Sequence, residues 1–253
     1  MYSAELKVAV DAANKAAEII RSLYQRNLKV DTKADRSPVT EADVRAEEAI
    51  RAILMGAFPQ HGFYGEETGQ SSLDAESLWL VDPLDGTKSF VRDCPFFSTQ
   101  IALMRAGRLV VGVSIAPVSG ELACAEAGKG ATVDGQPVRV SHVEALQDAI
   151  VSTGNIRTLA SGERWPRFGE LLQKISRVRG YGDYLHYHLL ARGAIDAVIE
   201  SDVNILDIAA LAVIVREAGG TFTDLDGKEP GLETTSVLAA NGALHASLRA
   251  CLG

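Results

Sequence analysis

The feature that most constrains this chain is a buried strand that ends in two acids. The segment "LWLVDP", residues 78–83, is a short apolar run typical of a buried strand, and it leads into "DPLD", residues 82–85. Asp82 and Asp85 repel each other, and Pro83 prevents them from sharing a regular helical turn. The sequence therefore predicts that a positive charge lies between the two carboxylates.

The first 140 residues combine two helices with an antiparallel sheet. Apolar residues at helical spacing predict a helix over residues 4–26. Thr40, with Asp43 as the acid of a capping box, predicts a second helix that extends to about residue 56. Residues 58–69, "FPQHGFYGEETG", are expected to form a loop. Short apolar runs between glycine turns predict an antiparallel meander over residues 99–140.

Near residue 140 the pattern changes to alternating strands and helices. Strands are predicted at 149–154, 196–201 and 221–227, and helices at 164–175, 184–195 (ending at Gly193) and 206–220. We therefore expect an α/β (α+β) chain with a soft boundary between 1–140 and 141–253. The two parts are expected to form one compact unit, with the functional site at their interface.

Composition and charge exclude several classes of function. Apolar residues make up 47% of the 253 residues, which predicts a folded globule, and no apolar run reaches the ~18 residues of a membrane helix. The N-terminal segment does not resemble a signal peptide, so we expect a cytoplasmic protein without a membrane partner. A net charge of −8 argues against nucleic acid as the main partner. Three widely spaced cysteines without a Cys-x-x-Cys motif predict reduced thiols.

Carboxylates also occur at three further places: Asp43, the "GEE" of residues 65–67, and Asp207 in "ESDVNILD". Hard divalent cations such as Mg²⁺ take oxygen ligands, mainly carboxylates, carbonyls and water. Each acid also has a simpler explanation. "DPLD" and "GEE" alone are typical of solvated turns, and Asp207 alone is predicted to be the N-cap of the helix that follows it.

The residues around "DPLD" suit phosphate chemistry. A bend at Pro83 turns the two carboxylates and the Leu84 carbonyl toward one centre, and Gly86 lets a substrate approach the backbone. Thr87 and Lys88 open a predicted helix, whose free N–H groups are a seat for phosphate. Lys88 is either a cation that faces phosphate or a solvated residue of the first helical turn.

Five motifs follow one another from about residue 38 to the C-terminal "LAANGALHASL". They are "SPVTEAD", "GEE", "LWLVDPLDGTKSF", the D-x-A-A-L that begins at Asp207, and "EAGG-x-x-TD". In this order they resemble the inositol monophosphatase superfamily of Mg²⁺-dependent phosphatases. The resemblance implies a layered α-β-α-β-α sandwich of the inositol monophosphatase and fructose-1,6-bisphosphatase type. It also implies a homodimer and a small phosphorylated metabolite as substrate.

The resemblance further implies a set of metal ligands. One Mg²⁺ would be held by Glu66, Asp82 and the Leu84 carbonyl. A second would be held by Asp82, Asp85 and Asp207, with Asp82 bridging the two ions. A third, weaker ion is expected near Glu66, and Mn²⁺ is an expected substitute for Mg²⁺.

Roles in catalysis and substrate binding are implied in the same way. Thr87 and Asp43 match the pair that orients the attacking water, and Glu66 is counted with them as catalytic. The backbone at Gly86 and Thr87 would hold phosphate oxygens. The residues expected to bind substrate are Asp85, Gly86, Thr87, Lys88, Asp183, Glu200 and Asp207.

The choice of substrate depends on the second half of the chain. A lysine at the place of Lys88 is usual in histidinol-phosphatases and in relatives that cleave adenosine bisphosphates. The segment that contains Gly182-Asp183-Tyr184 and Glu200 resembles the histidinol-phosphatase pattern. Histidinol phosphate carries an ammonium group and an imidazole, and a cationic tail is matched by nearby carboxylates. The expected reaction is therefore hydrolysis of L-histidinol phosphate to L-histidinol and phosphate in histidine biosynthesis.

Other functions remain open. Within enzymes they are a phosphatase for inositol-1-phosphate or for sugar phosphates broadly, and a 3′(2′),5′-bisphosphate nucleotidase. Outside enzymes they are a metal-binding or phospho-ligand-binding protein that keeps the scaffold, and a structural protein with solvated acidic turns. Two departures from the family pattern affect the pocket: Leu206 stands where many relatives have an aromatic residue, and Asp93 adds an acid near the site.

Overall fold

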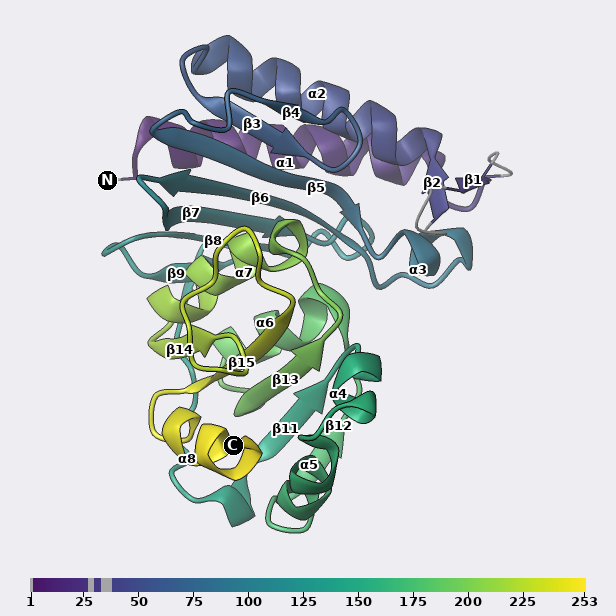
Figure 1. Ribbon diagram of the computed structural model, residues 1–253. Coiled ribbons are helices and arrows are strands. Elements are labelled where there is room, and N and C mark those ends of the chain that lie inside the picture. The colour runs from purple at the N-terminus through teal and green to yellow at the C-terminus, as the bar shows by residue number, and fades with distance from the viewer. Residues whose placement is uncertain (1, 27–29, 33–37) are drawn as a thin grey trace.

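Two packed helices form the outermost layer of the fold. In the computed structural model, which describes residues 2–26, 30–32 and 38–253, α1 (Ala4–Leu23) and α2 (Glu41–Ala57) cover one face of a large sheet (Figure 1). Small side chains on the buried side of α1 allow it to pack closely against its neighbours. These are Ala9, Ala12, Ala13, Ala16 and Ala17.

The second layer is an eight-stranded sheet that is covered on both faces. Along β5, Trp79 and Val81 join the core under α1 and α2, while Leu78 and Leu80 join the core on the opposite face, as the alternation of a strand requires. In spatial order the strands are β10 (Gln136–Val138), β9 (Ala131–Val133), β8 (Leu122–Glu126), β7 (Arg108–Ile115), β6 (Ser98–Arg105), β5 (Ser77–Asp85), β3 (Gly62–Gly65) and β4 (Gln70–Ser71).

The third layer, α6 (Asp183–Ala191) and α7 (Ile205–Glu217), lies between the two sheets (Figure 1). Nearly every residue of α7 is apolar and buried, as expected for a helix with sheets on both sides. A Cβ at Gly112 of β7 would lie 2.3 Å from the Ala210 carbonyl oxygen, so the close approach of α7 to the first sheet requires glycine there.

A five-stranded sheet and a final set of helices complete the sandwich (Figure 1). In spatial order its strands are β12 (Arg177–Arg179), β11 (Ile150–Thr153), β13 (Ala197–Ser201), β15 (Ser236–Asn241) and β14 (Gly220–Thr223). The outer helices are α4 (Arg157–Ser161), α5 (Trp165–Leu172) and α8 (His245–Leu252). Elements outside the layers are β1 (Val30–Thr32), β2 (Pro38–Thr40), α3 (Thr87–Val91) and a 3₁₀ turn, η1 (Leu146–Asp148). The architecture is the α-β-α-β-α sandwich that the motifs implied.

Most of the predicted elements are confirmed, with one clear error. The helix over 4–26 ends at Leu23, and the meander over 99–140 forms β6 to β10. The prediction of a loop over 58–69 is wrong, because residues 62–65 form β3 and pair in parallel with β5. Four residues flanked by glycines carry little periodicity, and only pairing with a neighbouring strand makes them a strand. The helices α4 and α8, the long strand β15 and the short strands β1, β2, β4 and β12 were not predicted.

The two sheets use successive parts of the chain. Strands of the first sheet end by residue 138, and those of the second begin at residue 150, while α7 packs on both. The division into 1–140 and 141–253 stays a prediction. In the part of the chain that the structure describes, no helix is long and apolar enough to cross a membrane. All three cysteines are free, as predicted.

Candidate active site

A bulge in β5 brings Asp82 and Asp85 to the same face of the first sheet. Asp82 lies opposite Gln100 of β6 and Asp85 lies opposite Ser98, so β5 has one residue more than β6 between these pairs. Residues three apart in a regular strand point to opposite faces, and the extra residue returns Asp85 to the face of Asp82. This is the face on which α7 packs.

Two further acids reach this place from other elements. β3 pairs in parallel with β5, with Gly65 beside Val81, so the next residue, Glu66, lies toward Asp82. Asp207 lies in the first turn of α7. One carboxylate oxygen from each of Asp82, Asp85 and Asp207 lies within 4.8 Å of the others. Acids from three separate parts of the chain, Glu66, the pair Asp82 and Asp85, and Asp207, therefore converge where β5 meets α7.

These carboxylates are crowded enough to raise one another's pKa values. Desolvation, and then the charge of Glu66, raise the pKa of Asp82 well above its ordinary range. Desolvation, and then the charge of Asp183, do the same to the pKa of Asp85. Desolvation raises the pKa of Asp207 to about 7, although Asp207 keeps some solvent exposure. A cation among these oxygens would relieve the repulsion.

The donor set fits a hard divalent cation. All candidate ligand atoms are oxygens, as Mg²⁺ and Mn²⁺ prefer. Among the described residues, no salt bridge pairs Asp82, Asp85 or Asp207 with a side-chain cation. The Leu84 carbonyl lies in the bulge 3.0 Å from Thr87 Oγ1 and has a second lone pair to offer. The identity of the metal stays a prediction.

Asp43 and Asp207 occupy the same position in two capping boxes. Thr40 caps α2 as predicted, and its amide donates to Asp43 Oδ2 at 2.7 Å. The prediction that Asp207 is an N-cap is wrong, because Asn204 caps α7 and its amide donates to Asp207 Oδ2 at 2.8 Å. The Asn204 side chain accepts a hydrogen bond from the Leu206 backbone amide at 2.7 Å. The helix therefore begins at Ile205, before the predicted cap, and Asp207 is its third residue.

Thr87 and Asp43 form the second part of the site. Thr87 Oγ1 lies 3.0 Å from Asp43 Oδ1 and 3.0 Å from the Leu84 carbonyl oxygen. Desolvation raises the pKa of Asp43, and its hydrogen bonds from Thr40 and Thr87 partly oppose this. Because the hydroxyl hydrogen of Thr87 is committed to these acceptors, its lone pairs remain able to accept a hydrogen bond from water.

Gly86 makes the turn from β5 into α3. Its φ is 90°, and a Cβ there would lie 3.1 Å from the Phe96 carbonyl oxygen. Only glycine suits this combination of backbone conformation and space. The predicted helix that Thr87 and Lys88 open is confirmed as α3, whose first amides have no acceptor within the helix.

A small hollow of about 20 Å³, room for roughly one water molecule, lies beside the acid cluster. Asp85, Asp183, Glu200 and Asp207 line it together with Asn155, Tyr187 and three apolar side chains. Desolvation, and then Glu200, raise the pKa of Asp183, while Lys88 is close enough to oppose the rise. The structure therefore brings the predicted substrate-binding residues Asp183 and Glu200 next to Asp85 and Asp207, which are predicted metal ligands.

Sequence reasoning missed three polar groups that hold Glu200. The Tyr187 hydroxyl donates to Glu200 Oε2 at 2.8 Å, and His186 Nε2 lies 3.1 Å from the same oxygen. The backbone amide of Asn155 donates to Glu200 Oε1 at 3.1 Å. One signal was present in the sequence, because Asp183, His186 and Tyr187 have the i, i+3, i+4 spacing of one helix face.

The two departures from the family pattern lie outside the hollow. Leu206 is 4% exposed and packs in the core of the middle layer, so it does not form a wall of the hollow as expected. Asp93 is exposed and lines a separate cavity of about 410 Å³ together with Arg26 and Thr40. Neither residue contributes a group to the acid-lined hollow.

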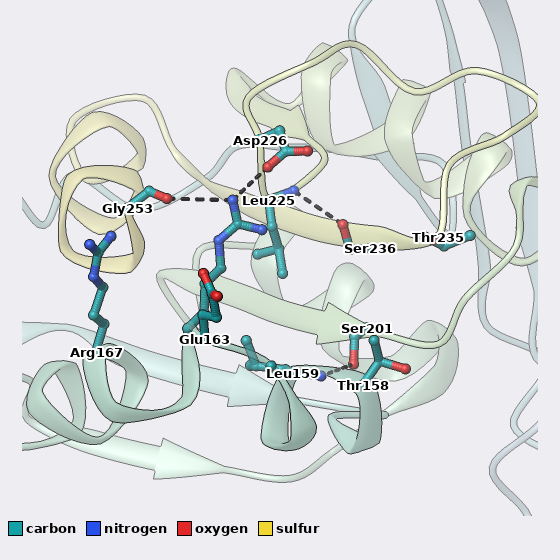
Figure 2. Close-up of a pocket in the computed structure, with 12 residues that line it drawn as sticks. Thr158, Leu159, Glu163, Arg167, Ser201, Leu225, Asp226, Thr235, Ser236 and Gly253 are labelled. Carbon is teal, nitrogen blue, oxygen red and sulfur yellow. Dashed lines mark hydrogen bonds and ion pairs between the residues drawn. The ribbon is translucent and has the colours of Figure 1, made fainter.

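A larger cavity, of about 680 Å³, lies between the outer helices and the second sheet (Figure 2). Arg164 lines it and donates to Asp226 Oδ1 at 2.5 Å, and the Leu225 backbone amide donates to Ser236 Oγ at 3.2 Å. None of the residues named for catalysis, metal or substrate lines it. We place the active site at the smaller hollow, because the converging carboxylates decide the chemistry and cavity size does not.

Ser98 is expected to hold Asp85 in its orientation. Its hydroxyl donates to Asp85 Oδ2 at 3.1 Å and accepts from Gln100 Nε2 at 2.8 Å. Mutation of a residue that hydrogen-bonds to a metal ligand typically changes metal affinity 10- to 100-fold, so Ser98→Ala should weaken Mg²⁺ binding by about tenfold. Calorimetric titration with Mg²⁺ measures this. Ser236→Ala, at the larger cavity, is the matched control, and equal affinities for the two variants would contradict the assignment.

Known proteins resemble this chain over its whole length. Residues 1–252 match the model of the inositol monophosphatase family. A histidinol-phosphatase of Mycobacterium tuberculosis is 41% identical over 247 residues, which cover 95% of each chain. An inositol-1-monophosphatase of Rhizobium meliloti is 36% identical over 254 residues, covering 98% of this chain and 95% of the relative. The crystal structure of extragenic suppressor protein suhB from Bartonella henselae superimposes with a TM-score of 0.91 at 34% identity, covering 99% and 98% of the two chains.

Proposed function

Because the chain belongs to the inositol monophosphatase family, we propose that this phosphomonoesterase converts L-histidinol phosphate to L-histidinol and phosphate in histidine biosynthesis, with Mg²⁺ as its cofactor. The observation that carries the proposal is the hollow in which Asp183 and Glu200 lie beside the acid cluster. The phosphoryl end of the substrate belongs at the cluster, and its cationic tail belongs at the hollow.

The proposed metal ligands are those that converge at the edge of the first sheet. Glu66, Asp82 and the Leu84 carbonyl would hold one ion, and Asp82, Asp85 and Asp207 would hold a second. A third, weaker ion would bind near Glu66. When bound, Mg²⁺ polarises the phosphoryl group, lowers the pKa of water and neutralises the cluster.

The chain's own residues orient the reactants. Asp43 fixes the Thr87 hydroxyl through the 3.0 Å hydrogen bond, and the Thr87 oxygen then accepts a hydrogen bond from the attacking water. This holds an oxygen lone pair of the water toward phosphorus. Glu66 is the third residue of this catalytic group. The amides of Gly86 and Thr87 donate to phosphate oxygens, which stabilises the charge that develops in the transition state.

The charge of the hollow favours a cationic tail. Four carboxylates and no basic side chain line it among the described residues. Asp85 and Asp207 are proposed metal ligands, which leaves Asp183 and Glu200 to meet the tail, while the charge of Lys88 acts on Asp183. An ammonium or a ring N–H is small enough for the space and is a strong donor to carboxylates. The relative named histidinol-phosphatase is also more similar to this chain, at 41% identity, than the inositol-1-monophosphatase, at 36%.

A phosphate-release screen tests the substrate. With Mg²⁺, kcat/KM for L-histidinol phosphate should exceed that for inositol-1-phosphate, fructose-1,6-bisphosphate and adenosine 3′,5′-bisphosphate by at least about tenfold, since a charged hydrogen bond is roughly twice as strong as a neutral one. Asp183→Asn should reduce this preference, and asparagine tolerates the φ of 47° at this position. Glu163→Gln, which removes a carboxylate from the larger cavity, is the control. A preference for inositol-1-phosphate would overturn the proposal.

The second candidate is a phosphatase for inositol-1-phosphate or for sugar phosphates broadly. The Rhizobium meliloti relative favours it, and such a substrate needs only hydrogen-bond partners in the hollow. For either substrate we propose a homodimer in the cytoplasm, which sedimentation velocity and cell fractionation would test.

A further inference from the structure

The Glu200 carboxylate is held from three directions. It lies on β13 and is 3% exposed. Tyr187 and His186 approach its Oε2 from α6, at 2.8 Å and 3.1 Å, and the Asn155 amide approaches its Oε1 at 3.1 Å from the segment after β11. A carboxylate has about four lone-pair directions, so these three donors leave one, on Oε1, for a ligand in the hollow.

The hydrogen on His186 Nε2 follows from its two neighbours. His186 is fully buried, and its Nδ1 lies 3.3 Å from Ser152 Oγ. Ser152 Oγ accepts from the Tyr181 amide at 3.3 Å, so its own hydrogen is free to donate to Nδ1. A carboxylate oxygen only accepts, which requires Nε2 to carry a hydrogen whether or not the ring is charged.

Gly154 gives the carboxylate its place. A Cβ at Gly154 would lie 2.1 Å from Glu200 Oε1 and 3.2 Å from His186 Cε1. The backbone after β11 therefore approaches both side chains as closely as it can, and Glu200 has little room to turn. A substitution at His186 would remove one of the few contacts that fix the direction of the remaining lone pair on Glu200 Oε1.

We propose that His186 is a positioning residue that aims Glu200 at the end of the substrate remote from phosphate, through an Nε2–H donor backed by Ser152. The role rests on the proposed function, because it assumes that Glu200 meets the tail of the substrate. His186 itself touches neither substrate nor metal. It sets discrimination between phosphate esters, and the acid cluster sets the rate of hydrolysis.

Two variants separate the hydrogen bond from the bulk of the ring. His186→Phe keeps an aromatic ring without a donor, and His186→Gln keeps an N–H donor on a flexible chain. The measurement is the ratio of kcat/KM for L-histidinol phosphate to kcat/KM for glycerol 2-phosphate, which lacks a cationic tail. His186→Phe should lower the ratio about tenfold, mostly through KM, and His186→Gln should recover it to within about threefold of wild type.

The controls distinguish positioning from folding. Tyr187→Phe removes another donor to the same oxygen and should lower the ratio in the same direction, which keeps the test decisive if His186→Phe does not fold. An unchanged ratio in both phenylalanine variants, or equal losses on both substrates, would overturn the inference. If wild type prefers inositol-1-phosphate, the proposed function fails separately, and the same variants are then compared on inositol-1-phosphate against glycerol 2-phosphate.

Discussion

Asp85→Asn is expected to lower kcat/KM by at least about 10²-fold while leaving the protein folded. The substitution keeps the shape of the side chain and removes one of three carboxylates whose oxygens lie within 4.8 Å of one another. Loss of a charged ligand weakens metal binding and the stabilisation of the transition state together. Steady-state phosphate release at saturating Mg²⁺ measures the effect.

The stability of the same variant makes the result specific. Desolvation, and then the charges of Asp183 and Asp207, raise the pKa of Asp85, so a neutral amide should leave the thermal midpoint of the metal-free protein unchanged or higher. Asp93→Asn is the matched control, because Asp93 is an exposed acid that lines a different cavity. A variant at Asp85 that keeps wild-type activity would remove it from the metal chemistry.

Removing the metal is expected to make stability depend on pH in a defined direction. The pKa of Asp207 rises from 3.8 to about 7 in the folded chain, mainly through desolvation, and those of Asp82 and Asp85 rise well above 3.8. Between pH about 4 and above 7 the folded state therefore holds protons that the unfolded chain has lost. This contribution lowers the free energy of unfolding as pH rises through that window.

Mg²⁺ should reverse this loss, and more so at high pH. At a concentration near 100 times Kd a ligand adds about 2.7 kcal/mol, which for a chain of this size corresponds to a rise of about 5–10 °C in Tm at pH 8. At pH 5 the rise should stay below about 2 °C, because the ligands must first lose their protons. Thermal melts with Mg²⁺ or EDTA at constant ionic strength measure this, and equal rises at the two pH values would contradict the proposed ligands.

Local chemistry explains what could be predicted from the sequence. Thr40 and Asp43 predict the start of α2, because a capping box needs only two residues that are three apart. The structure contains that box. The short apolar run of β5 and the long apolar segment of α7 identify buried elements for the same reason. The order of the acidic motifs also indicated the family, which the match over residues 1–252 confirms.

Distant contacts explain what could not. Which face Asp85 points to depends on a one-residue bulge against β6, and the place of Glu66 depends on the parallel register of β3, an element that the sequence suggested was a loop. Asn204 took the capping role expected of Asp207 because its side chain reaches the Leu206 amide.

The sequence by itself determined which carboxylates are candidate ligands and in what order they occur. It also placed Asp82 and Asp85 at the end of a buried strand and Asp207 near the start of a helix, because these features depend on residue type and short spacing. Only the tertiary structure decided that Asp207 of α7 meets Asp82 and Asp85 of β5, and that His186 and Tyr187 hold Glu200 beside them. Strand register, bulges and the packing of α6 on β13 arise from contacts between residues far apart in the chain, and no local pattern encodes them.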